Sequence, residues 1–171
     1  MRKAIFLDRD GVINEDAGYV GKIEHFKFID KVFEALKKIQ KHYLIIIITN
    51  QSGIGRGYYT YEDYIKVTNY MLEEFSKHGI KIEKIYYCPH VPEDNCKCRK
   101  PSPFFLLQAQ KEYGINLSTS WVIGDKLLDI EMGNKAGCKT LLINSPYVSH
   151  LNIPKCKNLY EAVEVILSSS A

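Results

Sequence analysis

The sequence lacks any apolar run long enough to cross a bilayer, and the apolar stretch at residues 43–48 has only the length of a strand. A strand is expected almost at the N-terminus, which leaves no room for a signal peptide and favours a cytoplasmic protein. A strong charge imbalance is also missing. The chain has 23 basic and 20 acidic residues and a net charge of +3, so charge gives no case for a nucleic-acid partner. No internal repeat, low-complexity segment or interdomain linker is visible, so residues 1–171 are expected to form one domain.

Cysteine is sparse, and its distribution argues against a disulfide framework. The chain has five cysteines, an odd number, and three of them are clustered. With one histidine they give C-x-H followed by C-x-C, which places four soft ligands close together: Cys88, His90, Cys96 and Cys98. This pattern is typical of a closed, structural zinc site, and reduced free thiols beside a histidine are the alternative. Cys138 and Cys156 stand alone and are interpreted as small buried or partly exposed side chains.

Strand-like and helix-like segments alternate along the chain. Apolar runs predict strands at residues 4–7, 43–48, 82–87, 121–123 and 140–143. The helices between them are expected to begin at polar caps and to stop at glycines. The caps are Asp30, Thr60, Ser102-Pro103 and Asn158, and the stops are Gly79, Gly114 and Gly137. This order predicts an α/β fold, a Rossmann-like three-layer sandwich with a central parallel sheet and helices on both faces.

Acidic and polar residues directly follow three of the predicted strands. Asp8 and Asp10 follow the first strand and point the same way in extended chain, Thr49-Asn50 ends the second, and Asp125 follows the fourth. Ligands of parallel sheets bind outside the carboxyl ends of the strands, so these residues should meet at one edge. Each has an ordinary alternative: an Asp-Gly turn, a strand-end hydroxyl or a helix cap. Their joint appearance at successive strand ends favours a functional site.

The chemistry of this set points to phosphoryl transfer. Three carboxylates at one site suit Mg²⁺, which prefers oxygen ligands and shares its coordination shell with substrate phosphates. Thr49 and Asn50 can donate hydrogen bonds to phosphate oxygens, and Lys100 supplies a positive charge unless it is a solvated surface lysine. An acid nucleophile, a second acid, a metal and cationic donors are the groups that transfer of a phosphoryl group requires.

Four segments resemble the motifs of the haloacid dehalogenase superfamily of phosphatases: DRDG at residues 8–11, TNQ at 49–51, KP at 100–101 and GDKLLD at 124–129. The resemblance is closest to the heptose bisphosphate phosphatases, through the strings FLDRDGVIN, DAGYV, TNQSGIGRG, YYCPH, CKCRKPSP and GDKLLDIEMG. It implies removal of the 7-phosphate of D-glycero-D-manno-heptose 1,7-bisphosphate, in the synthesis of lipopolysaccharide, S-layer or nucleotide-heptose precursors. The implied partner is a small phosphorylated sugar, with neither nucleic acid nor membrane, and a monomer is expected.

The resemblance also implies roles for the matching residues. Asp8 would be the nucleophile that forms an aspartyl-phosphate, and Asp10 would protonate the leaving alkoxide and then activate water. Mg²⁺ would be held by the Asp8 carboxylate, the Asp10 backbone carbonyl and Asp125. Thr49 and Lys100 would grip the transferring phosphoryl group. The other phosphate or substrate contacts implied are Asn50, Gln51, Ser52, Arg99, Lys126, Asp16 and Tyr19.

Several alternatives remain open on the sequence. About forty residues separate the first two motifs, too few for the cap domain of many relatives, so a capless fold with a zinc-binding loop that delivers Arg99 and Lys100 is expected. The short middle of this loop is closer in length to that of histidinol-phosphate phosphatase, whereas TNQSGIGRG and GDKLLD favour the heptose enzyme. TNQ-x-GIGRG also resembles polynucleotide 3′-phosphatases, against which the zinc loop and the lack of a basic surface argue. A zinc-stabilised binding module without turnover is disfavoured by two mutually repelling acids.

Overall fold

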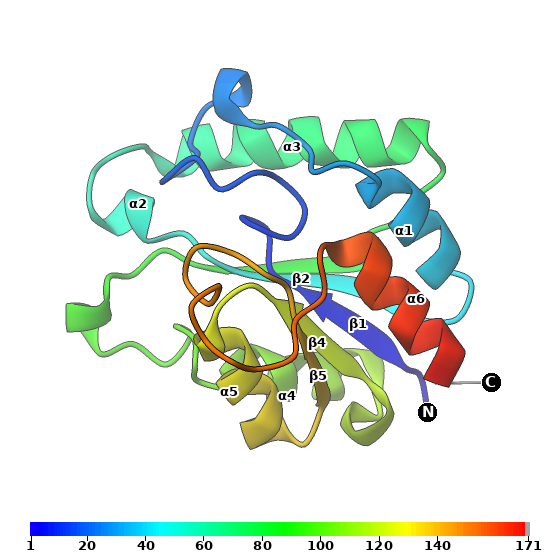
Figure 1. Ribbon diagram of the computed structural model, residues 1–171. Helices are drawn as coiled ribbons and strands as arrows, with labels where there is room; N and C mark the ends of the chain where they lie inside the picture. The colour runs from blue at the N-terminus through cyan, green and yellow to red at the C-terminus, as the bar shows by residue number, and fades with distance from the viewer. Residues whose placement is uncertain (170–171) are drawn as a thin grey trace.

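The computed structural model describes residues 1–169 and contains a five-stranded sheet whose strand pairings are all parallel. The strands lie in the order β3-β2-β1-β4-β5 (Figure 1). Their bounds are β1 Ala4–Leu7, β2 Leu44–Asn50, β3 Lys84–Cys88, β4 Trp121–Gly124 and β5 Lys139–Leu142. The helices are α1 Val32–Ile39, α2 Ser52–Gly55, α3 Tyr61–Lys77, α4 Phe104–Tyr113, α5 Leu127–Ala136 and α6 Leu159–Ser169. The predicted parallel α/β architecture is confirmed.

The sheet is covered on both faces, which explains the continuous apolar runs of its central strands. Helices α1, α3 and α6 lie on one side of the sheet, and α4 and α5 lie on the other (Figure 1). Successive side chains of β1 alternate between the two cores. Ile5 and Leu7 pack in the core with α1, α3 and α6, whereas Ala4 and Phe6 pack in the core with α4 and α5. Both sides of the strand are therefore apolar, and the sequence shows no polar alternation there.

The helix ends follow the predicted caps with two exceptions. Thr60 forms a capping box with Asp63 at the start of α3, and Asn158 Oδ1 accepts a hydrogen bond of 3.0 Å from a backbone N–H in the first turn of α6. The prediction of Asp30 as a cap is wrong, because Lys31 occupies the N-cap of α1 in a left-handed conformation with a φ of 67°. At α4 the N-cap is Pro103 itself. The short helix α2 and the three single 3-10 turns, η1 Ile23–His25, η2 Pro92–Asp94 and η3 Leu117–Thr119, were not predicted.

The central position of β1 places the predicted site residues at one edge of the sheet. Leu7, the last residue of β1, pairs with Ile47 of β2 and with Ile123 of β4. The residues that continue these three strands therefore leave the sheet side by side at its carboxyl edge. Between β1 and α1, residues 8–31 hold the single turn η1 and isolated bridges, in agreement with a capless fold. Among the described residues, no helix is both long and apolar enough for a membrane span.

Candidate active site

A cavity of about 320 Å³ lies at the carboxyl edge of the sheet and gathers most of the predicted site residues. Its predicted lining residues are Asp8, Asp10, Asp16, Tyr19, Asn50, Gln51, Ser52, Arg99, Lys100 and Lys126. The lining residues that the sequence did not single out are Gly18, Arg56, Tyr59, Leu128, Asp129 and Tyr147. Thr49 and Asp125, both almost fully buried, lie behind this lining. Residues from five separate segments thus converge on one polar cavity.

Asp8 at the end of β1 is buried and lies against a buried cation. Its Oδ1 accepts a hydrogen bond of 2.8 Å from the Arg9 backbone N–H and lies 3.1 Å from Lys100 Nζ. Burial raises the pKa of Asp8 to about 6, although the Lys100 charge opposes this shift. Lys100 also forms an ion pair of 2.7 Å with Asp129; burial acts against its charge, but the two carboxylates hold its pKa above the usual range. Asp8 is therefore held beside a fixed positive charge at the cavity wall.

Asp10 is only partly buried, and donors surround its carboxylate. Arg9, which is almost fully buried, contacts Oδ1 through Nη2 at 3.0 Å, and Asn14 Nδ2 donates to the same oxygen at 2.9 Å. Gln51 Nε2 donates to Oδ2 at 3.1 Å. The second carboxylate after β1 therefore has a fixed orientation at the cavity, as an acid and base group requires.

Asp125 follows β4 and has the environment of a metal ligand. Both of its carboxylate oxygens are buried, and neither has a hydrogen-bond partner among the described residues. Burial, followed by the Asp8 charge, raises its pKa to about 8. The Gly11 backbone lies so close that a Cβ there would overlap the Asp125 carboxylate. An unpaired buried carboxylate is costly unless a cation partners it, so these two oxygens fit Mg²⁺ well.

Asp129 is an acid that the sequence reading did not assign to the site. One ligand oxygen each of Asp8, Asp125 and Asp129 lies within 4.8 Å of the others, so the three could share a metal ion. The oxygens of Asp129 are already engaged, however, by Lys100 Nζ at 2.7 Å and by the Lys126 backbone N–H at 3.3 Å. Its position at the third residue of α5, where an acid completes a capping box, is the sequence signal that could have identified it. We assign it to the positioning of Lys100.

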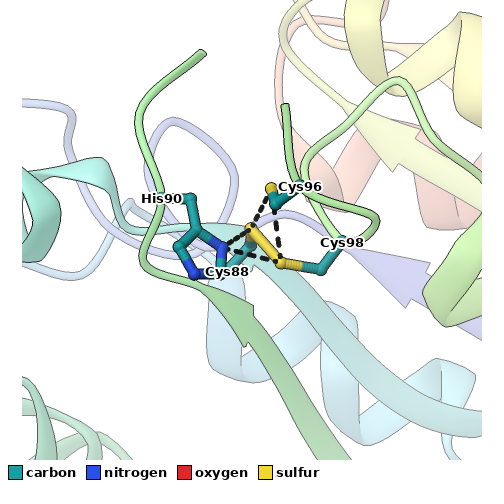
Figure 2. Close-up of side chains that lie close together, drawn as sticks. All are labelled: Cys88, His90, Cys96 and Cys98. Carbon is teal, nitrogen blue, oxygen red and sulfur yellow. Dashed lines mark hydrogen bonds between the residues drawn. A yellow bond between two sulfur atoms is a disulfide. The ribbon is translucent and has the colours of Figure 1, made fainter. Parts of the chain in front are cut away.

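The predicted zinc residues converge at the end of β3 and in the loop that follows it (Figure 2). Their ligand atoms lie within 4.8 Å of one another: those of Cys88, His90, Cys96 and Cys98. Cys88 and Cys98 are joined by a disulfide in the structure, which differs from the expected set of four free ligands. Since a ligating cysteine must be a thiolate, the disulfide and a zinc site are alternative states of the same two sulfur atoms. The His90 carbonyl accepts a hydrogen bond of 3.2 Å from Arg99 Nη1, which ties the loop to the cavity.

Comparison with known proteins identifies the family. The HAD-hydrolase-like family model matches residues 97–147. The D-glycero-beta-D-manno-heptose-1,7-bisphosphate 7-phosphatase of Helicobacter pylori (strain ATCC 700392 / 26695) is 46% identical over 168 residues, which cover 96% of this chain and 97% of the relative. The chain belongs to the heptose-1,7-bisphosphate 7-phosphatase family. A second member of this family, the D-glycero-alpha-D-manno-heptose-1,7-bisphosphate 7-phosphatase of Campylobacter jejuni subsp. jejuni serotype O:2, is 50% identical over 142 residues, 82% of this chain and 81% of the relative.

Solved structures of the heptose-1,7-bisphosphate 7-phosphatase family share the fold. The crystal structure of the enzyme of B. bronchiseptica, complexed with magnesium and phosphate, has a TM-score of 0.90 and 28% sequence identity over 98% of this chain and 99% of that chain. The structure of the Burkholderia thailandensis enzyme has a TM-score of 0.73 with 24% identity over the same shares, and it bears on the fold alone. The resemblance to the haloacid dehalogenase superfamily and to this family is confirmed.

Aromatic and basic side chains form the mouth of the cavity in this heptose phosphatase family member. Arg56 lies over the Tyr19 ring, with 5.6 Å from its guanidinium carbon to the ring centroid. Lys126 Nζ lies 4.6 Å from the centroid of Tyr147, whose hydroxyl donates to Asp16 Oδ2 at 2.9 Å. Burial opposes the charge of Lys126, but the nearby carboxylates of the site hold its pKa above the usual value. The mouth thus combines cations with flat apolar surfaces.

Thr49 and Asn50, two predicted phosphate contacts, form hydrogen bonds within the protein. Thr49 is 1% exposed, and its hydroxyl oxygen accepts a hydrogen bond of 2.9 Å from Gln51 Nε2. Asn50 Oδ1 accepts a hydrogen bond of 3.3 Å from the Lys100 backbone N–H, so it joins the end of β2 to the loop that carries the lysine. The phosphate contacts of Thr49 and Asn50 remain predictions.

Proposed function

We propose that the chain is a Mg²⁺-dependent phosphatase that removes the 7-phosphate of D-glycero-D-manno-heptose 1,7-bisphosphate through an aspartyl-phosphate intermediate. The observation that carries this proposal is the position of Asp8, 3.1 Å from the buried Lys100 and close to the unpaired carboxylate of Asp125. A nucleophile, a fixed cation and a pair of oxygens that can bind a metal ion are the groups required for phosphoryl transfer by a carboxylate.

Side chains at the cavity can carry out each bond change and each proton transfer of the proposed reaction. A carboxylate oxygen of Asp8 attacks phosphorus, and the bond from phosphorus to the sugar oxygen breaks. Asp10 gives its proton to that leaving oxygen and then accepts a proton from the water that attacks phosphorus, which releases phosphate and restores Asp8. Lys100 offsets negative charge on the phosphoryl oxygens. Mg²⁺, held by Asp8, Asp125 and the Asp10 backbone carbonyl, would supply further positive charge when bound.

A bisphosphate fits the distribution of charge around the cavity. Lys100 lies at the nucleophile, whereas Arg99 and Lys126 line the cavity as further cations. The planar fork of Arg99 suits the oxygens of a second phosphate group. The two Helicobacter and Campylobacter relatives are named for opposite anomers of the substrate, so both anomers are candidates here. We further propose that the chain acts as a single-domain, cytoplasmic monomer in the synthesis of heptose precursors of lipopolysaccharide or S-layer glycans.

We also propose that the reduced loop after β3 holds a structural Zn²⁺ ion. The support is the convergence of three sulfur atoms and one ring nitrogen, a donor set typical of structural zinc. The loop has little apolar content of its own, so a bound metal would supply its order. Because Arg99 donates to the His90 carbonyl, this order extends to a residue of the cavity.

A substrate screen tests the proposed function directly. The values of kcat/KM are measured with Mg²⁺ for both anomers of the heptose bisphosphate, for histidinol phosphate and for 3′-phosphorylated DNA. The heptose bisphosphate is expected to give the highest value. A higher value for histidinol phosphate would reassign the substrate, and the absence of turnover on all phosphate esters would favour a binding module instead.

Replacing Arg99 with alanine is expected to lower kcat/KM for the heptose bisphosphate roughly ten- to a hundred-fold, because a charge-assisted contact contributes on the order of 1.5–3 kcal/mol. Its kcat/KM for p-nitrophenyl phosphate, which lacks a second phosphate, is expected to change little. Steady-state kinetics on both substrates provide the measurement. Equal losses on the two esters would mean that Arg99 serves the reacting phosphoryl group.

Loss of the Zn²⁺ ion from the loop after β3 is expected to lower the thermal stability of the protein and its preference for the bisphosphate. Hydrolysis of small esters is expected to be lost only after these effects. Protein purified under reducing conditions without chelator is expected to contain zinc by elemental analysis, and Cys96→Ser is expected to lose it. Cys138→Ser is the matched control, because Cys138 is a buried cysteine outside the loop. Reduced wild-type protein that holds no zinc and retains full stability and activity would refute the zinc site.

A further inference from the structure

The two oxygens of Asp10 have different surroundings. Oδ1 is anchored by Arg9 through Nη2 at 3.0 Å and Nε at 3.3 Å, and by Asn14 Nδ2 at 2.9 Å. Among the described residues, Oδ2 has a single hydrogen-bond partner, Gln51 Nε2 at 3.1 Å. An oxygen that already accepts three donors is poorly placed to exchange a proton with a substrate. Oδ2 is therefore the oxygen available for proton transfer, and Gln51 is the residue that holds it.

Both N–H donors of the Gln51 side-chain amide are engaged within the protein. Its Nε2 donates to Asp10 Oδ2 and to Thr49 Oγ1, at 3.1 and 2.9 Å, and its Oε1 accepts a hydrogen bond from the Tyr59 hydroxyl. The residue is 2% exposed. A primary amide has two N–H donors, and both are used within the protein. This arrangement differs from the substrate contact that the family resemblance implies for Gln51.

The Tyr59 hydroxyl supports the orientation in which the Gln51 amide donates to Asp10. Its ring is buried against Gly21 and Gly53, where a Cβ at either glycine would overlap the ring. Burial also raises the pKa of Tyr59 to about 12, so the hydroxyl keeps its proton and donates it to Gln51 Oε1. A flipped amide would turn its oxygen toward the Asp10 carboxylate and its nitrogen toward the tyrosine. The acceptor-only carboxylate of Asp10 and the donating hydroxyl of Tyr59 together favour the orientation in which Gln51 donates to Asp10.

We propose that Gln51 is a positioning residue that holds Oδ2 of Asp10 as the oxygen that exchanges the proton, with its amide oriented by Tyr59. This inference rests on the proposed function, in which Asp10 serves as acid and base. In the first half-reaction the Oδ2–H bond breaks, its proton passes to the leaving sugar oxygen, and the electron pair stays on Oδ2. In the second half-reaction Oδ2 accepts a proton from the attacking water, so the cycle leaves Asp10 unchanged.

The dependence of rate on the leaving group tests this role. p-Nitrophenolate leaves without protonation, phenolate needs more assistance, and a sugar alkoxide needs the most. The ratio kcat/KM covers the steps up to transfer of phosphate to Asp8, so it reports the acid step alone. Phenyl phosphate and p-nitrophenyl phosphate have almost the same shape. A difference between them therefore reports proton transfer and excludes a lost contact with the sugar.

Gln51→Met keeps the length of the side chain but removes its hydrogen bonds. We expect kcat/KM to fall roughly ten- to a hundred-fold for the heptose bisphosphate, by an intermediate factor for phenyl phosphate, and less than about threefold for p-nitrophenyl phosphate. Tyr59→Phe is expected to give the same order of effects with smaller factors. Gln110→Met, the same change at an exposed glutamine outside the cavity, is the matched control and is expected to keep wild-type kinetics on all three esters. A lost contact to the phosphoryl group would slow all three esters by a similar factor.

The possible results separate the positioning role from the proposed function. Equal losses on phenyl and p-nitrophenyl phosphate in Gln51→Met would overturn the positioning role, and Tyr59→Phe kinetics identical to wild type would overturn the role of the tyrosine. If Gln51→Met does not fold, as judged by circular dichroism, the leaving-group series of Tyr59→Phe decides instead. A wild-type protein that turns over none of these esters with Mg²⁺ would defeat the proposed function itself.

Discussion

Replacing Asp8 with asparagine is expected to abolish turnover, with a loss in kcat/KM on the order of 10⁴-fold or more, because an amide is a far weaker nucleophile than a carboxylate. The variant is expected to fold. Lys100 keeps its 2.7 Å ion pair with Asp129 after the Asp8 charge is removed, so no buried cation is left unpaired. Hydrolysis of p-nitrophenyl phosphate and of the heptose bisphosphate provides the measurement.

The Asp8 prediction needs a control for the effect of an aspartate-to-asparagine change itself. Asp30→Asn, purified in parallel, makes the same chemical change at an exposed acid away from the cavity and is expected to keep wild-type activity. Asp10→Asn is expected to be nearly inactive as well, but to retain substrate binding, because Asp10 acts on the proton and not on phosphorus. Substantial turnover by Asp8→Asn at the level of Asp30→Asn would refute a covalent intermediate on Asp8.

Removing Mg²⁺ by dialysis is expected to stop turnover while leaving the circular dichroism spectrum unchanged, and Asp125→Asn is expected to reproduce this loss in the presence of Mg²⁺. Within residues 1–169, both Asp125 oxygens are buried without a hydrogen-bond partner, so they are available to the ion, and the fold does not depend on them for hydrogen bonds. Full activity without added or bound Mg²⁺ would contradict the assignment of Asp125 as a ligand.

The affinity for Mg²⁺ is also expected to depend on pH. In the metal-free protein the pKa of Asp8 is raised to about 6 and that of Asp125 to about 8, whereas the usual pKa of an aspartate is 3.8. The ion binds the ionised carboxylates and displaces their protons. For each proton displaced, its dissociation constant should rise roughly tenfold per pH unit below 8. Titration at pH 6, 7 and 8 measures this dependence. An affinity that is the same at pH 6 and pH 8 would contradict it.

The same pKa shifts predict how the stability of the metal-free protein changes with pH. Both pKa values are raised on folding, so the stability that these carboxyls contribute is fully present below about pH 4 and is lost as pH rises through about 6 and 8. The melting temperature of the metal-free protein is therefore expected to fall over this range, with Mg²⁺ raising it more at pH 8 than at pH 6. In Asp125→Asn the effect of Mg²⁺ should disappear.

Residues that follow buried strands were predictable because the pattern is local. Apolar runs such as residues 4–7 and 43–48 mark strands covered on both faces, and the polar residues directly after them must lie at the carboxyl edge. The helix start at Thr60 was equally predictable, since a capping box involves only neighbouring residues. The prediction of Asp30 as a cap is wrong because it rests on a local preference of aspartate, whereas Lys31 occupies the N-cap position in the folded chain.

The sequence by itself determined the parallel α/β fold, the order of the site segments, the acids after β1 and β4 and the clustered ligands of the loop, because each depends on composition and spacing over a few residues. Only the tertiary structure decided which partner each side chain takes. Lys100 pairs with Asp129, 29 positions away, and Gln51 with Asp10, 41 positions away. Burial is likewise a product of the assembled core, so only the structure shows that the Asp125 carboxylate is enclosed, has no hydrogen-bond partner in the part of the chain that is described, and is shifted in its pKa. Because of its long-range contact with Asp10, Gln51 is proposed as a positioning residue, whereas the sequence alone predicts it as a substrate contact.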